Sequence, residues 1–302
     1  MPANKLSNNE KAKDAVIARS DDGTIQITFT VPFTDIEKAR NDAANQLGKD
    51  IVVPGFRKGN APIQKVLESI PENTLLEKSL SLILPNLLSE AIKKHNLKPA
   101  IYPKFELLKT NEGEDWQIRA VTCEILPIEL GDYKKEITGL ARTKSIWTPQ
   151  KGKKDEKESH KEMSRAEKEQ EVIKVLINTV KVKIAKVLID EEVNSRLSKL
   201  LERIEKLGLN LEGYLASIGK TAQSLRSEYE AQSQSALALD LILTEIAKIE
   251  KIQVGKNDVD EAISASKADP GLAKELDTPE RRQFIEVILK RRKVLDNLIS
   301  LT

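Results

Sequence analysis

The stretch DDGTIQITFTV, residues 21–31, gives the clearest indication of the fold. Isoleucine, phenylalanine and valine alternate with threonine and glutamine over residues 24–31, which is the period of a strand buried on one face. The Asp-Asp-Gly run in front of it is typical of a hairpin turn, because these residues tolerate the unusual backbone angles of tight turns. A first strand over residues 13–19 would complete the hairpin.

Further helices and strands are expected beyond this hairpin. Glycine and proline at four of nine positions indicate a loop within residues 49–62. Helical patterns cover residues 34–47, 62–70 and 72–95, and strands are expected over residues 98–109 and 115–126. A sheet of sequence-adjacent strands beside helices is an antiparallel α+β arrangement. We therefore predict an α+β N-terminal domain over residues 1–135.

The second half of the chain shows helical periodicity only. Apolar residues recur at three- and four-residue steps between glycine and proline breaks. The expected helices cover residues 161–180, 190–207, 211–218, 222–250 and 256–267, with a last one starting at Thr278-Pro279-Glu280. We predict an all-α C-terminal domain over residues 161–302. A charged linker is expected at 136–160, although this charge pattern also fits the solvated start of a long helix.

Composition excludes several classes of protein. The 302 residues suit about two domains, and 49 basic against 47 acidic residues leave a net charge of only +2. Any electrostatic site must therefore be local. One cysteine and two histidines exclude a disulfide framework and a cysteine or polyhistidine metal centre. Neither a secretory signal nor an apolar run of membrane-spanning length is recognisable, so we expect a cytoplasmic protein.

No pattern of catalytic residues is present in the sequence. The glycine signatures of nucleotide-binding and hydrolase sites are missing, so we expect no catalytic residue, no cofactor and no metal. Cys123 falls in an alternating strand and is expected to be a buried thiol. His95 at a helix end and His160 in a charged stretch are expected to be ordinary surface residues.

The loop after the first helix is the candidate functional site. Two glycines flank a tip with one aromatic and two cations: Gly55, Phe56, Arg57, Lys58 and Gly59. Residues 49–65 carry four cations and one carboxylate. Such a tip suits a mixed surface of protein and phosphate, with phenylalanine in an apolar pocket and arginine on an anion. In the alternative interpretation, the phenylalanine packs inward and the cations are merely solvated.

This loop resembles the ribosome-docking signature of the trigger factor family, bacterial chaperones at the nascent-chain exit. The family pattern Gly-Phe-Arg-x-Gly-x-x-Pro is matched at Gly55, Phe56, Arg57, Gly59 and Pro62. Residues 13–135 follow the order of the family's ribosome-binding domain, and residues 187–250 look like the start of its helical substrate-holding domain. The resemblance implies docking on large-subunit protein and ribosomal RNA near the tunnel exit. It also implies ATP-independent holding of unfolded or nascent polypeptides.

One departure from the family concerns enzyme activity. Members usually carry an FKBP-type prolyl-isomerase domain between these two parts, with a pocket lined by aromatics. Here the intervening stretch is short, and Trp147 is the sole aromatic from Lys134 to Gly213. We therefore expect no isomerase activity. We also expect no DNA or membrane partner, whereas a homodimer off the ribosome remains open. Two alternatives are a prolyl isomerase with an unrecognised site and an RNA-associated ribosome assembly factor that uses the basic loop.

Overall fold

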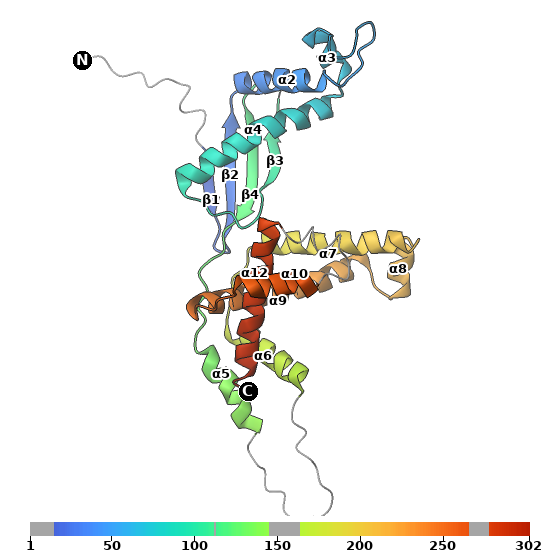
Figure 1. The fold of residues 1–302 in the computed structure, drawn as a ribbon. Helices are drawn as coiled ribbons and strands as arrows, with labels where there is room; N and C mark the ends of the chain where they lie inside the picture. The colour runs from blue at the N-terminus through green and yellow to red at the C-terminus, as the bar shows by residue number, and fades with distance from the viewer. Residues whose placement is uncertain (1–14, 112, 145–163, 266–277) are drawn as a thin grey trace, which may run out of the picture. The chain divides into compact units, whose positions relative to one another are not determined.

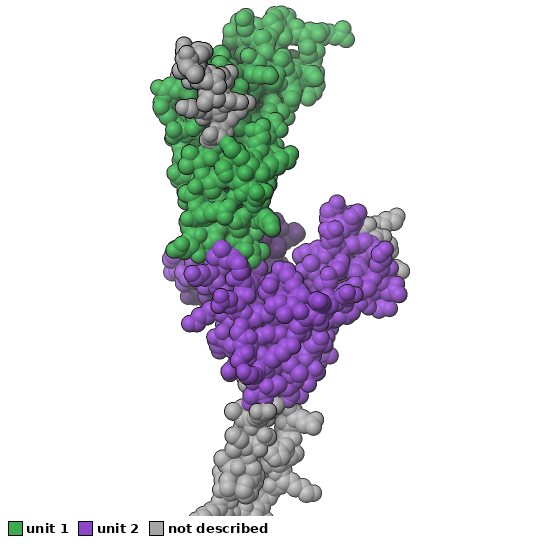
Figure 2. Space-filling view, turned by 90° about the vertical axis from the view of Figure 1, so that its left-hand side faces the viewer, with its two compact units in different colours: residues 1–125, 185–188 green, residues 126–184, 189–302 purple. Residues whose placement is uncertain are grey.

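The computed structural model describes residues 15–111, 113–144, 164–265 and 278–302. Its contacts divide the chain into two compact units (Figure 2). The N-terminal unit comprises residues 1–125 with 185–188, and the helical unit comprises residues 126–184 with 189–302. No helix in the described ranges is long and apolar enough to cross a membrane.

The N-terminal unit is built on a four-stranded antiparallel sheet in the order β1-β2-β4-β3 (Figure 1). The strands are β1 (Val16–Arg19), β2 (Thr24–Val31), β3 (Lys104–Lys109) and β4 (Trp116–Cys123). The alternation in β2 is confirmed, since its isoleucines, Phe29 and Val31 are buried while its glutamine and two of its threonines are partly exposed. The strand expected from residue 98 begins only at Lys104, because Pro99 and Pro103 lack the N–H that a ladder needs.

Three helices complete this unit: α2 (Phe33–Leu47), α3 (Ile63–Ser69) and α4 (Glu72–His95). In Figure 1, α4 lies across the sheet, and its Leu84 and Leu88 share one core with the apolar face of β2 and β4. The helix continues through Pro85 even though the pyrrolidine ring removes one backbone hydrogen bond. Burial of leucines on the same helix compensates for that loss. Together these elements confirm the predicted α+β class.

The helical unit contains α5 (Tyr133–Lys144), α6 (Arg165–Thr179), α8 (Leu211–Ser217), α9 (Ala222–Ile249), α10 (Lys256–Ala265) and α12 (Pro279–Ile299). It also contains α7 (Lys186–Lys206) from Ile189 onward. Helices α9 and α12 both begin at a threonine cap: the hydroxyl of Thr221 accepts from the N–H of Ser224 at 3.1 Å, and Thr278 caps α12 in the same way. One apolar core joins α5, α6, α9 and α12, with Leu176, Ile242 and Ile246 fully buried. The all-α prediction for this half is confirmed.

Helix α5 favours the helical alternative over the linker for the first part of residues 136–160. It takes in residues 136–144 of the segment predicted to be a charged linker; residues 145–160 lie outside the described ranges. Tyr133 and Ile137 are buried in the helical core together with Leu130. Tyr133, Ile137, Leu140 and Ala141 recur at three- and four-residue steps, so the sequence holds a short helical pattern that the linker prediction overlooked. Packing against the rest of the unit stabilises this short helix.

A polar cluster ties α5 to the end of α9. The Tyr133 hydroxyl donates to Glu250 Oε1 at 2.7 Å, and Lys134 Nζ lies 2.7 Å from the same oxygen. Burial, and then the hydrogen bond to this carboxylate, raise the pKa of Tyr133 well above its usual range. Partial burial opposes ionisation of Glu250, yet the two hydrogen bonds outweigh it and lower the pKa of the carboxyl. The cluster is therefore an ion pair joined to a neutral phenol at neutral pH.

Candidate functional site

The glycine-flanked loop connects α2 to α3 and stands on a small apolar cluster. Val53 is buried against residues of α2, α3 and α4, and Ala61 and Ile63 pack at the other end of the loop. Gly48 ends α2 where a Cβ would lie only 2.9 Å from the carbonyl oxygen of Ala44. Both ends of the loop are thus held by packing, and the tip between them projects from a fixed base.

Two tight turns shape the tip. Gly55 and Gly59 adopt φ values of +85° and +81°, which favour glycine over any residue with a Cβ. The Phe56 N–H donates to the Val53 carbonyl at 3.1 Å, and the Asn60 N–H donates to the Arg57 carbonyl at 2.9 Å. A Cβ on Gly55 would meet no heavy atom within 4 Å. The sequence therefore needs glycine there for its backbone angle, not for space.

The tip side chains lie on the surface of the protein. Phe56 is 39% exposed and belongs to none of the buried clusters, so the alternative in which it packs into the core is wrong. Arg57 is exposed, and within the described ranges its guanidinium has no hydrogen-bond or ion-pair partner. The structure brings Phe56, Arg57 and Lys58 together on one short, solvent-facing turn.

Two further residues belong to this surface, and the sequence indicated neither the exposure of Val52 nor the pairing of Asp50. Val52 is 71% exposed, which places a second apolar side chain on the same loop as Phe56. Successive residues of an extended segment point to opposite sides, so one of the pair Val52–Val53 had to face outward, but the sequence does not say which. Asp50 Oδ1 lies 3.3 Å from Lys58 Nζ. This contact partly neutralises one of the two cations at the tip.

The local positive charge is consequently smaller than the sequence count implies. Lys65 Nζ is 2.7 Å from Glu68, and Lys58 pairs with Asp50. Across residues 49–65, all of which the structure describes, Lys49 and Arg57 are the cations without a recorded partner. The candidate surface therefore combines the Phe56 ring and the Val52 side chain with the free guanidinium of Arg57, and Lys49 at the start of the loop is a second cation without a partner. Such a surface favours a mostly protein partner with one or two anionic contacts.

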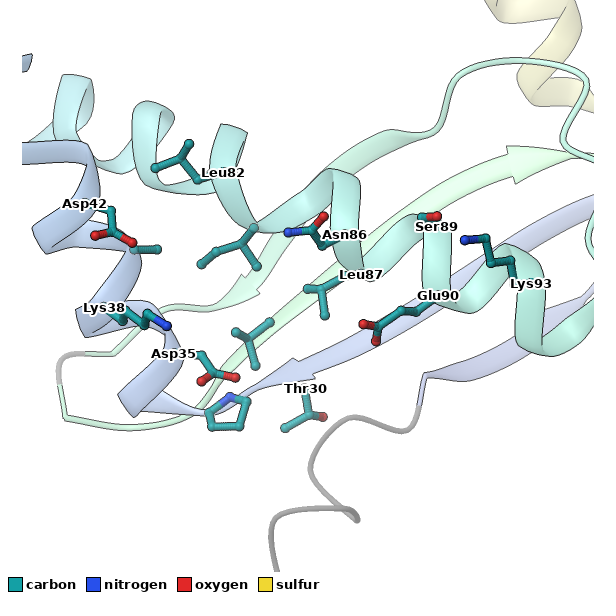
Figure 3. Close-up of a pocket in the computed structure, with 14 residues that line it drawn as sticks. Thr30, Asp35, Lys38, Asp42, Leu82, Asn86, Leu87, Ser89, Glu90 and Lys93 are labelled. Carbon is teal, nitrogen blue, oxygen red and sulfur yellow. The ribbon is translucent and has the colours of Figure 1, made fainter. Parts of the chain in front are cut away.

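A separate groove of about 550 Å³ opens beside α2 and α4 in the same unit (Figure 3). Its rim carries Asp35, Lys38 and Asp42 from α2 and Glu90 and Lys93 from α4, as Figure 3 shows. Charges of both signs alternate along it, so it has no uniform field for phosphate. The groove adds no support to an RNA-binding interpretation.

The other reactive side chains carry no site in the described part of the chain. Cys123 is fully buried, and burial, followed by the nearby Asp22 carboxylate, raises the pKa of its thiol. This confirms the expected inert cysteine. His95 lies in the last turn of α4, and His160 falls outside the described residues. No group of three or more acidic, cysteine or histidine side chains within the described ranges could hold a metal.

Comparison with known proteins identifies relatives of both halves. Residues 15–146 match the family model described as bacterial trigger factor protein, and residues 150–300 match the model for its C-terminus. A trigger factor of Streptococcus agalactiae serotype Ia is 35% identical over 108 residues, 36% of this chain and 25% of the relative. A trigger factor of Streptococcus mutans is 32% identical over 132 residues, 44% of this chain and 31% of the relative. The matches thus span about a quarter to a third of those proteins.

Similarity of fold extends over almost the whole chain. A solved structure described as "Promiscuous Substrate Recognition in Folding and Assembly Activities of the Trigger Factor Chaperone" superposes with a TM-score of 0.60. The superposition covers 95% of this chain and 99% of that one. Because the sequence identity is only 13%, it shows similarity of fold and nothing further. The two family models cover the N-terminal and helical halves in the family's order. This chain belongs to the bacterial trigger factor family.

Proposed function

We propose that this protein is an ATP-independent chaperone that docks at the ribosomal tunnel exit and holds emerging polypeptides. The N-terminal unit would bind large-subunit protein and ribosomal RNA, and the helical unit would hold clients, both in the cytoplasm. The observation that carries the proposal is the projecting tip, where Phe56 is exposed and Arg57 has no partner within the described chain. An aromatic anchor beside a free guanidinium is a common composition of a binding hot spot.

The helical unit leaves apolar side chains in contact with solvent, as holding a client requires. They lie around the α7–α8 turn and on α12: Leu207, Leu209, Leu211, Phe284 and Ile288. Scattered apolar residues within a charged surface favour many weak contacts over one deep pocket. Such contacts need no nucleotide to form or release.

Co-sedimentation with purified ribosomes at increasing salt concentrations tests this proposal. Binding through two apolar side chains and the free cations Arg57 and Lys49 should weaken only gradually with salt, as expected for the release of about one or two counterions. A steep loss of ribosome binding with salt, as expected for several phosphate contacts, would favour the RNA-associated assembly factor instead. Absence of the protein from the ribosome pellet at low salt would contradict the docking proposal itself.

Asp50→Asn is expected to strengthen ribosome binding. The substitution removes the carboxylate beside Lys58 and frees a second cation at the tip. Because this pair is well exposed, we expect a modest gain, about twofold to fivefold, and a salt dependence steeper by about one charge. Glu68→Gln is the matched control, since it frees Lys65 on α3 away from the tip. Equal gains from both variants, or no gain from Asp50→Asn, would show that Asp50 does not modulate docking.

We further propose that the chain has no prolyl-isomerase activity. The two matched segments end at residue 146 and begin at residue 150, which leaves no room for an inserted domain between them. Turnover of a short proline peptide that survives repurification and is blocked by an FKBP-type ligand would contradict this. A homodimer off the ribosome stays a prediction, which sedimentation of the free protein can check.

A further inference from the structure

A pocket of about 180 Å³ lies in the N-terminal unit, where α2, the start of α4 and the start of β4 come together. Its apolar wall consists of Phe33, Leu76 and Trp116, and the charged residues that line it are Arg40 and Glu72. This volume equals that of roughly six water molecules in the liquid, which suits a ligand of about six to eight non-hydrogen atoms. Apolar walls with a few polar groups are the usual composition of a small-molecule site.

The aromatic wall is held in place by the sheet and by the start of α2. Trp116 is the first residue of β4 and pairs with Val31 of β2 across the sheet. The Phe33 N–H donates to Asp115 Oδ1 at 3.0 Å, which joins the first residue of α2 to the residue before β4. Trp116 also belongs to the main core of the unit, and Leu76 packs against that core. The wall is therefore formed by the fold itself, before any ligand binds.

The indole of Trp116 carries a polar group that the protein leaves unsatisfied. Trp116 is only 5% exposed, and its Nε1–H has no hydrogen-bond acceptor among the described residues. Native structures pair most buried donors, so an exception calls for an explanation. An acceptor atom of a ligand in the pocket that Trp116 lines would satisfy this donor. Thr110 and Asn73 line the same pocket, and their hydroxyl and amide groups offer further hydrogen bonds.

The two charged residues of the lining are opposite in sign and unpaired. Arg40 is half-buried on α2, and Glu72 is exposed at the first position of α4. Among the described residues neither side chain has an ion-pair or hydrogen-bond partner, so the two do not pair with each other. A guanidinium binds a carboxylate in a fork geometry, and a carboxylate binds an ammonium. A ligand with both charges can therefore bridge the two side chains, whereas a simple anion is repelled by Glu72 and a simple cation by Arg40.

We propose that this pocket binds a free α-amino acid with a small apolar side chain, such as valine. The carboxylate of the ligand pairs with Arg40 and accepts the Trp116 N–H, while its ammonium pairs with Glu72. Its side chain packs against Phe33 and Leu76. Valine is within the size that the volume of the pocket allows. The pocket shares no residue with the loop between α2 and α3, so amino-acid binding is a further function of the N-terminal unit.

The test follows the indole N–H of Trp116 by NMR in the full-length chain with isotope-labelled tryptophan. The chain has two tryptophans, so Trp147→Phe assigns the two signals. Valine is expected to shift the Trp116 proton signal downfield and saturably, with a dissociation constant in roughly the millimolar range, because the proton gains an acceptor. Valinamide lacks the carboxylate and N-acetylvaline lacks the ammonium, so each should bind at least about tenfold more weakly.

Arg40→Gln and Glu72→Gln are the pocket variants, and each removes one charge from a side chain outside the buried core. Each should weaken valine binding at least about tenfold, while the circular dichroism stays that of the wild type. Lys38→Gln on α2 and Glu77→Gln on α4 are the matched controls, because they make the same changes of charge outside the pocket and should bind valine as the wild type does. The proposal is overturned if valine leaves the Trp116 signal unmoved, if valinamide or N-acetylvaline binds as tightly as valine, or if pocket and control variants bind valine equally.

Discussion

Replacing Phe56, Arg57 and Lys58 together by alanine is expected to abolish association with ribosomes. All three side chains are exposed on the turn between Gly55 and Gly59, outside every buried cluster of the N-terminal unit. The variant removes the aromatic anchor and the free guanidinium at once, and hot-spot residues of these types carry most of an interface's binding energy. The measurement is the fraction of protein that pellets with ribosomes.

The same variant should fold as the wild type does. Loop-tip truncations outside the core cost about 0.5 kcal/mol or less each, so thermal unfolding should be nearly unchanged. A control at Tyr102, Lys98 and Lys93, exposed residues of the same unit outside the loop, should retain binding when changed to alanine. Wild-type levels of the loop variant in the ribosome pellet would show that docking uses another surface. Unfolding of the variant would mean that Phe56 contributes to the core after all.

A fragment that begins at residue 126 is expected to be far more stable than one that begins at residue 161. Sequence periodicity alone suggests that residues 161–302 form a self-sufficient helical domain. In the structure, however, Leu130, Tyr133 and Ile137 fill part of the same core as Ile246 and Leu298. Loss of a large buried side chain costs about 2–5 kcal/mol, and three such losses approach the whole stability of a typical domain.

Thermal unfolding followed by circular dichroism compares the two fragments, and light scattering of a diluted denatured client compares their holding activity. Residues 126–302 should unfold cooperatively and reduce scattering, whereas residues 161–302 should show a broad, low-temperature transition. Ile137→Ala in the full chain is the milder check, because it opens a single cavity in this core. Coincident unfolding curves for the two fragments would show that α5 is dispensable.

Much of the fold could be predicted from local sequence. The alternation over residues 24–31 was sufficient for β2, and the Thr278-Pro279-Glu280 run marked the start of the last helix, where the structure has α12. The candidate loop was recognisable because glycines at Gly55 and Gly59 supply backbone angles that few other residues adopt. These features depend on the nearest few neighbours in the chain, so their signal is contained in the sequence itself.

Other features depend on residues that are distant along the chain. Helix α5 is held where Tyr133 meets Glu250, 117 positions away along the chain, and nothing in the sequence indicates that contact. A pocket of about 410 Å³ in the helical unit exists because Ala247 on α9 and Val287 on α12 lie close together. Even within the loop, the sequence supplied the charges, but only the folded backbone brings Asp50 within 3.3 Å of Lys58. Local backbone preferences are encoded residue by residue, whereas long-range contacts form only when the whole core assembles. The tertiary structure alone therefore determined which charges and apolar faces stay available for partners.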